Sequence, residues 1–133
     1  MHASVIYVLF VLMAATATAS VPPPVQNRLP IAGDRAMAPR EYLYFMAGKD
    51  ASTLDRLVKC ESGWKPGIRN PNSSATGLAQ FLDSTWISTR LRMGLDPSLS
   101  LRIDPYAHVD TLVWLWREDG ERHWLESRPC WSR

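Results

Sequence analysis

Residues 60–64 read Cys-Glu-Ser-Gly-Trp, and they end a segment whose apolar residues have helical spacing. Positions i, i+3 and i+4 of that segment are Leu54, Leu57 and Val58, and position i+7 of the same stripe is Glu61. The pattern predicts an amphipathic helix that carries a carboxylate on its buried face. A carboxylate in that place is costly, which makes Glu61 a candidate functional residue.

This helix is expected to run from about Ser52 to Ser62. Ser52 can act as its N-cap, with Asp55 three residues on in the manner of a capping box, and Gly63 can end it. Burial and the negative end of the helix dipole both disfavour a charged group in the last turn, so we expect a raised pKa for Glu61. Such a pKa suits a proton donor near neutral pH. The alternative is a Glu at the rim of the core whose carboxyl group reaches water.

Two further motifs follow, Gly77-Leu78-Ala79-Gln80-Phe81 and Ser84-Thr85-Trp86, after a loop rich in Pro, Asn and Ser. As a set with residues 60–64, they resemble the lysozyme-like superfamily that cleaves peptidoglycan. The resemblance is to its lytic transglycosylase domains of the soluble-transglycosylase type, and also to resuscitation-promoting factor and goose-type lysozyme domains. It covers about residues 50–131, and the motifs are specific only in combination.

The resemblance implies that Glu61 is the catalytic acid. The matching motif positions, with one nearby aromatic residue, make up the expected substrate-binding set: Ser62, Gly77, Leu78, Gln80 and Trp86. The side-chain amide of Gln80 can read an N-acetyl group or a sugar hydroxyl, or it can satisfy a buried carbonyl group. The helical spacing of Trp86 with Arg90 leaves a place in the core as its alternative role.

Most glycosidases use two carboxyl groups, whereas only Glu61 is a convincing acid in this sequence. The lytic transglycosylases that the chain resembles use a single Glu as acid and then as base. We therefore expect cleavage of the MurNAc–GlcNAc β-1,4 bond with 1,6-anhydro ends. The Ala-Tyr-Asn motif of many longer transglycosylases has no clear equivalent here, which leaves lysozyme-type hydrolysis open. A weakly active wall-binding or signalling module, or a component of an envelope machine, is a further alternative.

The N-terminus has the features of an export signal. Residues 5–15 are almost continuously apolar, and Ala17-Thr18-Ala19 has the small-x-small form of a signal-peptidase site. We expect a signal peptide at residues 1–19, a Pro-rich linker at 20–39 and the lysozyme-like transglycosylase domain at 40–133. Because no Lys or Arg precedes the apolar run, an uncleaved membrane anchor through residues 5–19 is the alternative. Export implies the periplasm, or the extracellular space and cell wall.

Net charge limits the classes of binding partner, and the cysteine content predicts a disulfide. The 133 residues carry a formal net charge of +2, which suits an anionic wall polymer and is far below what a nucleic-acid binder needs. We expect peptidoglycan glycan strands as partner, no nucleic acid, no metal or cofactor, and a monomer. The only two cysteines, Cys60 and Cys130, are expected to pair in the oxidising compartment that export implies.

The rest of the chain predicts a mainly α, compact lysozyme-like domain with little or no sheet. Further helices are expected at 40–47, from an N-cap at Asp83 or Ser84 to Met93, and from an N-cap at Asp104 to about Asp119. The buried stripe of the last helix is expected to be Val109, Leu112, Val113 and Trp116. Residues 77–82 are expected to be a buried extended piece. His108 stands where the resembled family usually has Asn, and a structural role is expected for it.

Overall fold

The computed structural model describes residues 36–133. The expected signal peptide or anchor at 1–19 and most of the expected linker lie outside the described residues. The first described helix begins at Pro39. No described helix has both the length and the apolar character needed to span a membrane.

Within residues 36–133 the backbone forms helices and 3₁₀ turns, and the predicted mainly α class is confirmed. In chain order the elements are α1 (Pro39–Ala47), η2 (Gly48–Asp50), α2 (Ala51–Ser62), α3 (Asp83–Arg92), η3 (Leu99–Ile103), α4 (Pro105–Asp119), η4 (Gly120–Trp124) and α5 (Arg128–Trp131). Pairing between extended residues is limited, in this described part, to two isolated bridges that Thr76 makes with Arg69 and Phe81. Of the expected extended piece, residues 77–80 instead form a turn, Phe81 pairs with Thr76 and Leu82 is extended; the whole segment is called the 77–82 turn below.

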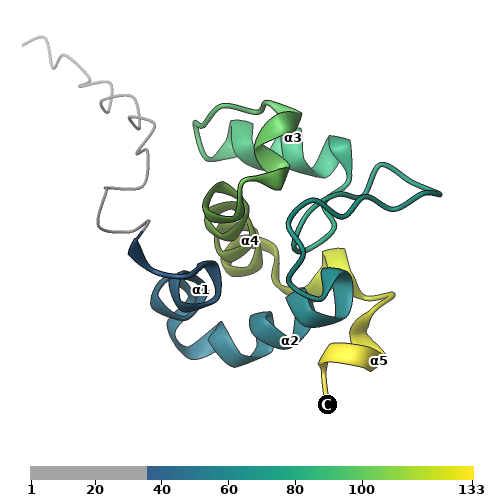
Figure 1. The fold of residues 1–133 in the computed structure, drawn as a ribbon. Helices are drawn as coiled ribbons and strands as arrows, with labels where there is room; N and C mark the ends of the chain where they lie inside the picture. The colour runs from purple at the N-terminus through teal and green to yellow at the C-terminus, as the bar shows by residue number, and fades with distance from the viewer. Residues whose placement is uncertain (1–35) are drawn as a thin grey trace, which may run out of the picture.

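Helix α4 lies at the centre of the domain, with α1 on one side and α3 on the other (Figure 1). Its start is as predicted: Pro105 is the first helical residue, and the Asp104 carboxylate accepts hydrogen bonds from the backbone N–H groups of Tyr106 and Ala107. Val109, Leu112 and Val113 of the predicted buried stripe are buried, and Trp116 is half-buried.

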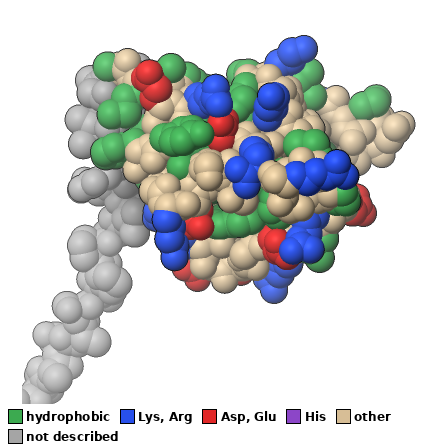
Figure 2. All heavy atoms as spheres, turned by 90° about the horizontal axis from the view of Figure 1, so that it is seen from below, with side chains coloured by type: hydrophobic (Ala, Val, Ile, Leu, Met, Phe, Trp, Pro, Cys, Tyr) green, Lys and Arg blue, Asp and Glu red, His purple; other side chains and the backbone are tan. Residues whose placement is uncertain are grey.

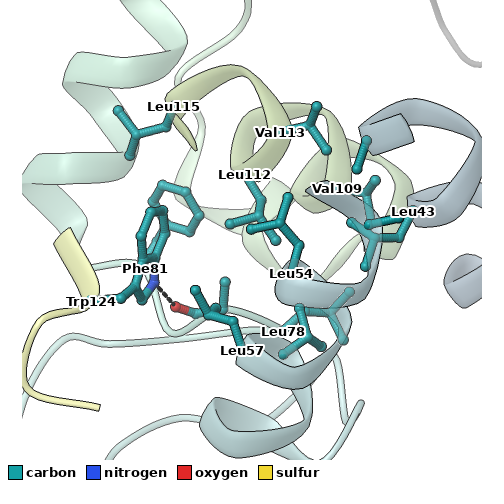
Figure 3. Close-up of a cluster of buried hydrophobic side chains, with 14 of the residues drawn as sticks. Leu43, Leu54, Leu57, Leu78, Phe81, Val109, Leu112, Val113, Leu115 and Trp124 are labelled. Carbon is teal, nitrogen blue, oxygen red and sulfur yellow. Dashed lines mark hydrogen bonds between the residues drawn. The ribbon is translucent and has the colours of Figure 1, made fainter. Parts of the chain in front are cut away.

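Helix α2 crosses this assembly and packs against α1 at its start and α5 at its end. Leu54, Leu57 and Val58 are fully buried, as their spacing predicted. Figure 3 shows Leu54 and Leu57 among side chains of α4 and of the 77–82 turn. The Trp124 indole N–H donates to the Ala79 carbonyl at 2.9 Å, which ties the C-terminal region to that turn (Figure 3).

Two predicted helix starts are wrong in detail. Ser52 is an exposed residue in the first turn of α2, because η2 runs directly into the helix and makes Asp50 the N-cap residue. Helix α3 is preceded by Leu82 at the N-cap, without a side-chain cap. Asp83 is the first residue of α3 and forms an ion pair with Arg102 at 2.7 Å. In both places a tertiary or turn interaction replaces the local cap.

Candidate active site

Glu61 lies in the last turn of α2, and its side chain is half-buried. Gly63 ends the helix as predicted: it adopts a left-handed conformation with φ 60° and ψ 31°, and its N–H donates to the Lys59 carbonyl at 3.0 Å. The half-buried position falls between the two expectations for Glu61, which were a fully buried carboxylate and a carboxyl group that reaches water.

The surroundings of Glu61 raise the pKa of its carboxyl group, as the sequence predicted. Burial is the largest cause, because it disfavours the charged form. The Ser127 side chain acts in the opposite direction and lowers the pKa, and the nearby charge of Glu126 raises it further. The helix dipole is not needed to account for the direction. Ser127 and Glu126 were not identified from the sequence as part of the site.

Both of these residues belong to the C-terminal segment, residues 125–131, which is fastened to α2. The predicted disulfide joins Cys60 and Cys130, with their Cα atoms 6.2 Å apart. The Arg56 guanidinium also donates to the Trp131 carbonyl at 2.9 Å. The expected disulfide was the sequence signal for this arrangement, because it places the residues before Cys130 next to the residue after Cys60.

On the other side of α2, Asp55 gathers three donors. Arg40 donates to both of its oxygens, Tyr44 donates at 3.0 Å and the Trp64 indole donates at 2.9 Å. Burial by itself would raise the pKa of Asp55, but the hydrogen bonds from Arg40, Tyr44 and Trp64 outweigh it and lower that pKa. Asp55 is therefore a buried anchor and not the capping-box residue that the sequence predicted.

The position of Gly77 has no room for a side chain. Its φ is +87°, and a Cβ atom placed on it would lie 2.4 Å from the Arg102 carbonyl oxygen and 2.6 Å from the His108 ring. The His108 Nδ1–H donates to that same carbonyl at 2.7 Å, and its Nε2 accepts from the Ala79 N–H at 2.9 Å. Burial is the main reason that the pKa of His108 falls to about 4. The imidazole is thus neutral at pH 7 and structural, as expected, and it holds the 77–82 turn in place.

The remaining expected substrate-binding residues differ in what they offer to a ligand. Gln80 donates its amide N–H groups to the carbonyls of Ile68 at 3.1 Å and Gly77 at 2.9 Å, which leaves its carbonyl oxygen without a partner among the described residues. Ser62 is buried and donates to Val58 within its own helix at 3.2 Å. Leu78 is a core residue. Of these three side chains, Gln80 has a polar atom available to a sugar.

Trp86 cannot serve as a sugar platform in this structure. Its side chain is 0 % exposed, its ring packs edge-on to Phe81, and its indole N–H donates to the Ser98 carbonyl at 3.1 Å. The expected contact between Trp86 and substrate is therefore corrected to a place in the core. The spacing of the helix left this alternative open, and burial decides it.

Most other carboxylates of residues 36–133 have structural partners. Asp55 and Asp83 are paired as described above, and Asp104 caps α4. Asp119 is bound by Arg92, Arg122 and His123, which lower its pKa, the hydrogen bond from Arg92 being the largest cause. Within this described part, no group of three or more His, Cys, Asp or Glu residues could hold a metal ion. Glu61 is half-buried and forms no ion pair with another described residue, and Asp50 of η2 shares both features.

A known protein family matches the part of the chain that includes Glu61. Residues 45–115, which are 71 of the 133 residues, match the family model described as the transglycosylase SLT domain. The chain belongs to this family. No curated protein matches the chain in a sequence comparison. The match confirms the expected lytic transglycosylase-type domain, and it makes peptidoglycan the substrate class of the family.

The SLT match also marks which parts of the site are shared with the family model. Glu61, Gly77 and Gln80 lie inside the matched residues, together with His108. The match ends within α4, so the C-terminal segment with Glu126, Ser127 and Cys130 lies outside it.

Proposed function

We propose that this SLT domain cleaves the MurNAc–GlcNAc β-1,4 bond of peptidoglycan, with Glu61 as its single general acid and base. The observation that carries the proposal is the half-buried Glu61 carboxyl group, whose raised pKa keeps a larger share of it protonated near neutral pH. Family membership supports the substrate class, and the structural pairing of the other buried carboxylates supports the single-acid mechanism.

In the proposed reaction, protonated Glu61 donates its proton to the glycosidic oxygen while the bond to C1 of MurNAc breaks. The GlcNAc hydroxyl leaves, and an oxocarbenium-like centre develops at C1. The Glu61 carboxylate then removes the proton from the C6 hydroxyl of MurNAc, whose oxygen closes on C1. The product is a 1,6-anhydro end, and Glu61 is protonated again for the next turnover.

Gln80 is proposed to bind the sugar from the turn that faces α2. Its amide nitrogen is fixed by the carbonyls of Ile68 and Gly77, so its carbonyl oxygen is held in one orientation. A fixed acceptor can receive a hydrogen bond from an N-acetyl N–H or a hydroxyl group at low entropic cost. Figure 2 shows Lys and Arg side chains scattered over one face of the domain. Separated positive charges of this kind can bind an anionic polymer, but they do not form the dense basic patch that a nucleic-acid site needs.

One observation favours a second candidate, hydrolysis of the same bond. Glu126 is a carboxyl group close enough to Glu61 to act on its pKa, and a second carboxyl group is what water activation would require.

Mass spectrometry of the fragments released from purified peptidoglycan tests the proposal. Transglycosylation predicts muramic ends lighter by one water than the hydrated, reducing ends. Hydrated ends that become anhydro ends in Glu126→Gln would identify a hydrolase in which Glu126 activates water. Absence of any release by the folded, oxidised chain would contradict both candidates.

A further inference from the structure

The C-terminal segment, residues 125–131, packs against the helix that carries the candidate catalytic acid, although the SLT match ends at residue 115. Two links fix this segment on α2: the Cys60–Cys130 disulfide and the hydrogen bond from Arg56 to the Trp131 carbonyl. Ser127 is the N-cap residue of α5, one helical turn before Cys130, and α5 packs against α2, whose last turn carries Glu61.

We propose that the C-terminal segment is a second wall of the site and that Ser127 is a positioning residue for the Glu61 carboxyl group. The inference rests on the proposed function, because it concerns the same acid. It adds a residue that the family match does not include.

The hydrogen bonds around Ser127 suit this role. Its hydroxyl oxygen accepts from the Trp131 indole N–H at 3.2 Å, and its hydroxyl proton points to the Trp124 carbonyl at 3.2 Å. The Trp131 indole also reaches the Trp124 carbonyl, at 3.3 Å. If the hydroxyl proton turns toward Glu61, the Trp124 carbonyl therefore keeps a donor, and no buried polar group is left unpaired.

A hydroxyl in this setting can bind Glu61 in both protonation states. It accepts from the protonated carboxyl group, and after proton transfer it rotates and donates to the carboxylate. The second bond is charge-assisted and the stronger of the two, which agrees with the lowering effect of Ser127 on the pKa of Glu61. A residue that acts first as acid and then as base needs such a partner in each step.

Glu126 supplies the opposing effect from the same segment. It is exposed, and its charge raises the pKa of Glu61. The other elements that pack on α2 contribute no comparable charge at this end: Arg40 of α1 is bound by Asp55, and Lys49 and Asp50 of η2 lie at the start of the helix. The segment thus moves the pKa of Glu61 in two directions through adjacent residues.

The decisive experiment is an NMR titration of the Glu61 side-chain carboxyl carbon in the full, oxidised chain. Ser127→Ala should raise the titration midpoint, Ser127→Thr should restore it, and Glu126→Gln should lower it. Ser132→Ala is the matched control for the hydroxyl and Glu118→Gln the matched control for the charge, and neither should move the midpoint. Because Glu126 is exposed, Glu126→Gln should fold normally, and it still tests the effect of the segment on the pKa of Glu61 if Ser127→Ala folds poorly.

Wall digestion gives a second measurement. Ser127→Ala should slow the release of fragments roughly tenfold, and it should shift the alkaline limb of the pH profile upward while Glu126→Gln shifts it downward. Unchanged Glu61 midpoints in both variants would overturn the inference. Opposite midpoint shifts in a chain that releases nothing from peptidoglycan would support the positioning role and reject the proposed function, so the two failures are distinguishable.

Discussion

The Trp64 indole N–H donates to the Asp55 carboxylate at 2.9 Å, across nine residues that include Glu61. Trp64 has a φ of 65°, a left-handed conformation that is costly for a residue other than Gly. The hydrogen bond offsets that cost and folds the chain back along α2 directly after the turn that carries Glu61. Asp55 and Trp64 therefore fix the end of the helix from which Glu61 projects.

Trp64→Phe keeps an aromatic ring but removes this donor. We expect a loss of about 1–3 kcal/mol in the free energy of unfolding, because a buried, charged acceptor loses one of its hydrogen bonds. Denaturant unfolding measures the change. Trp114→Phe is the matched control, since the indole of Trp114 packs on Arg92 and donates to no described residue. Equal effects of the two substitutions would contradict the role assigned to Trp64.

Glu61→Gln should abolish the release of fragments from peptidoglycan while the fold is retained. The amide fills the same space but cannot donate a proton, so the rate should fall by at least on the order of 10²–10⁴. Turbidity and fragment release are the measurements, with circular dichroism to verify folding. Glu118→Gln, which removes an exposed carboxylate of α4, should retain full activity. A folded Glu61→Gln chain that digests wall at the normal rate would exclude Glu61 as the acid.

Replacing both cysteines by Ser should lower stability by ~4 kcal/mol on the loop-entropy model, because the disulfide closes a loop of 70 residues. Equilibrium unfolding of the oxidised chain and of the double variant gives this difference. A thiol count on the denatured, unreduced chain should find none. Two reactive thiols per chain would contradict the bond, and an unchanged free energy of unfolding would contradict its stabilising role.

Acid should destabilise the domain through His108. The pKa of this imidazole is about 4 in the folded chain and ordinarily 6.5, so the unfolded chain binds one more proton between these pH values. Stability is therefore lost as pH falls from 6.5 to about 4, by about 3 kcal/mol from this group. The pKa of the hydrogen-bonded Asp55 carboxylate is lowered from its ordinary value of 3.8, so the stability that this group contributes is lost as pH falls below 3.8.

His108→Gln isolates this effect. Gln does not titrate. Its side-chain carbonyl oxygen can take the place of the imidazole Nε2, which accepts a hydrogen bond from the Ala79 N–H. The free energy of unfolding of this variant should change less between pH 6.5 and 4 than that of the parent chain, as followed by denaturant unfolding at several pH values. Parallel curves for the two chains would show that His108 does not titrate on unfolding.

Local signals predicted the helix that carries Glu61, its end at Gly63 and the cap of α4, because each depends on residues a few positions apart. The failures have a common cause in long-range contacts. The sequence predicted a capping role for Asp55, but its carboxylate binds Arg40 and Trp64 instead. It also predicted Asp83 as a possible N-cap, but Asp83 forms an ion pair with Arg102. Ser127 carried no motif at all, and its place beside Glu61 follows from a disulfide whose partner is 70 residues away.

The disulfide also determines when the site is complete. A newly made chain with both thiols reduced has no covalent link between α2 and the segment that carries Ser127, and only the Arg56 bond and packing hold the two together. In the proposed scheme, oxidation adds the covalent link that fixes this segment on α2. Cys130 is exposed and Cys60 is half-buried, so the same bond stays within reach of a reductant after folding. In the proposed scheme, the redox state of the surroundings would decide which copies of the chain carry a finished catalytic centre.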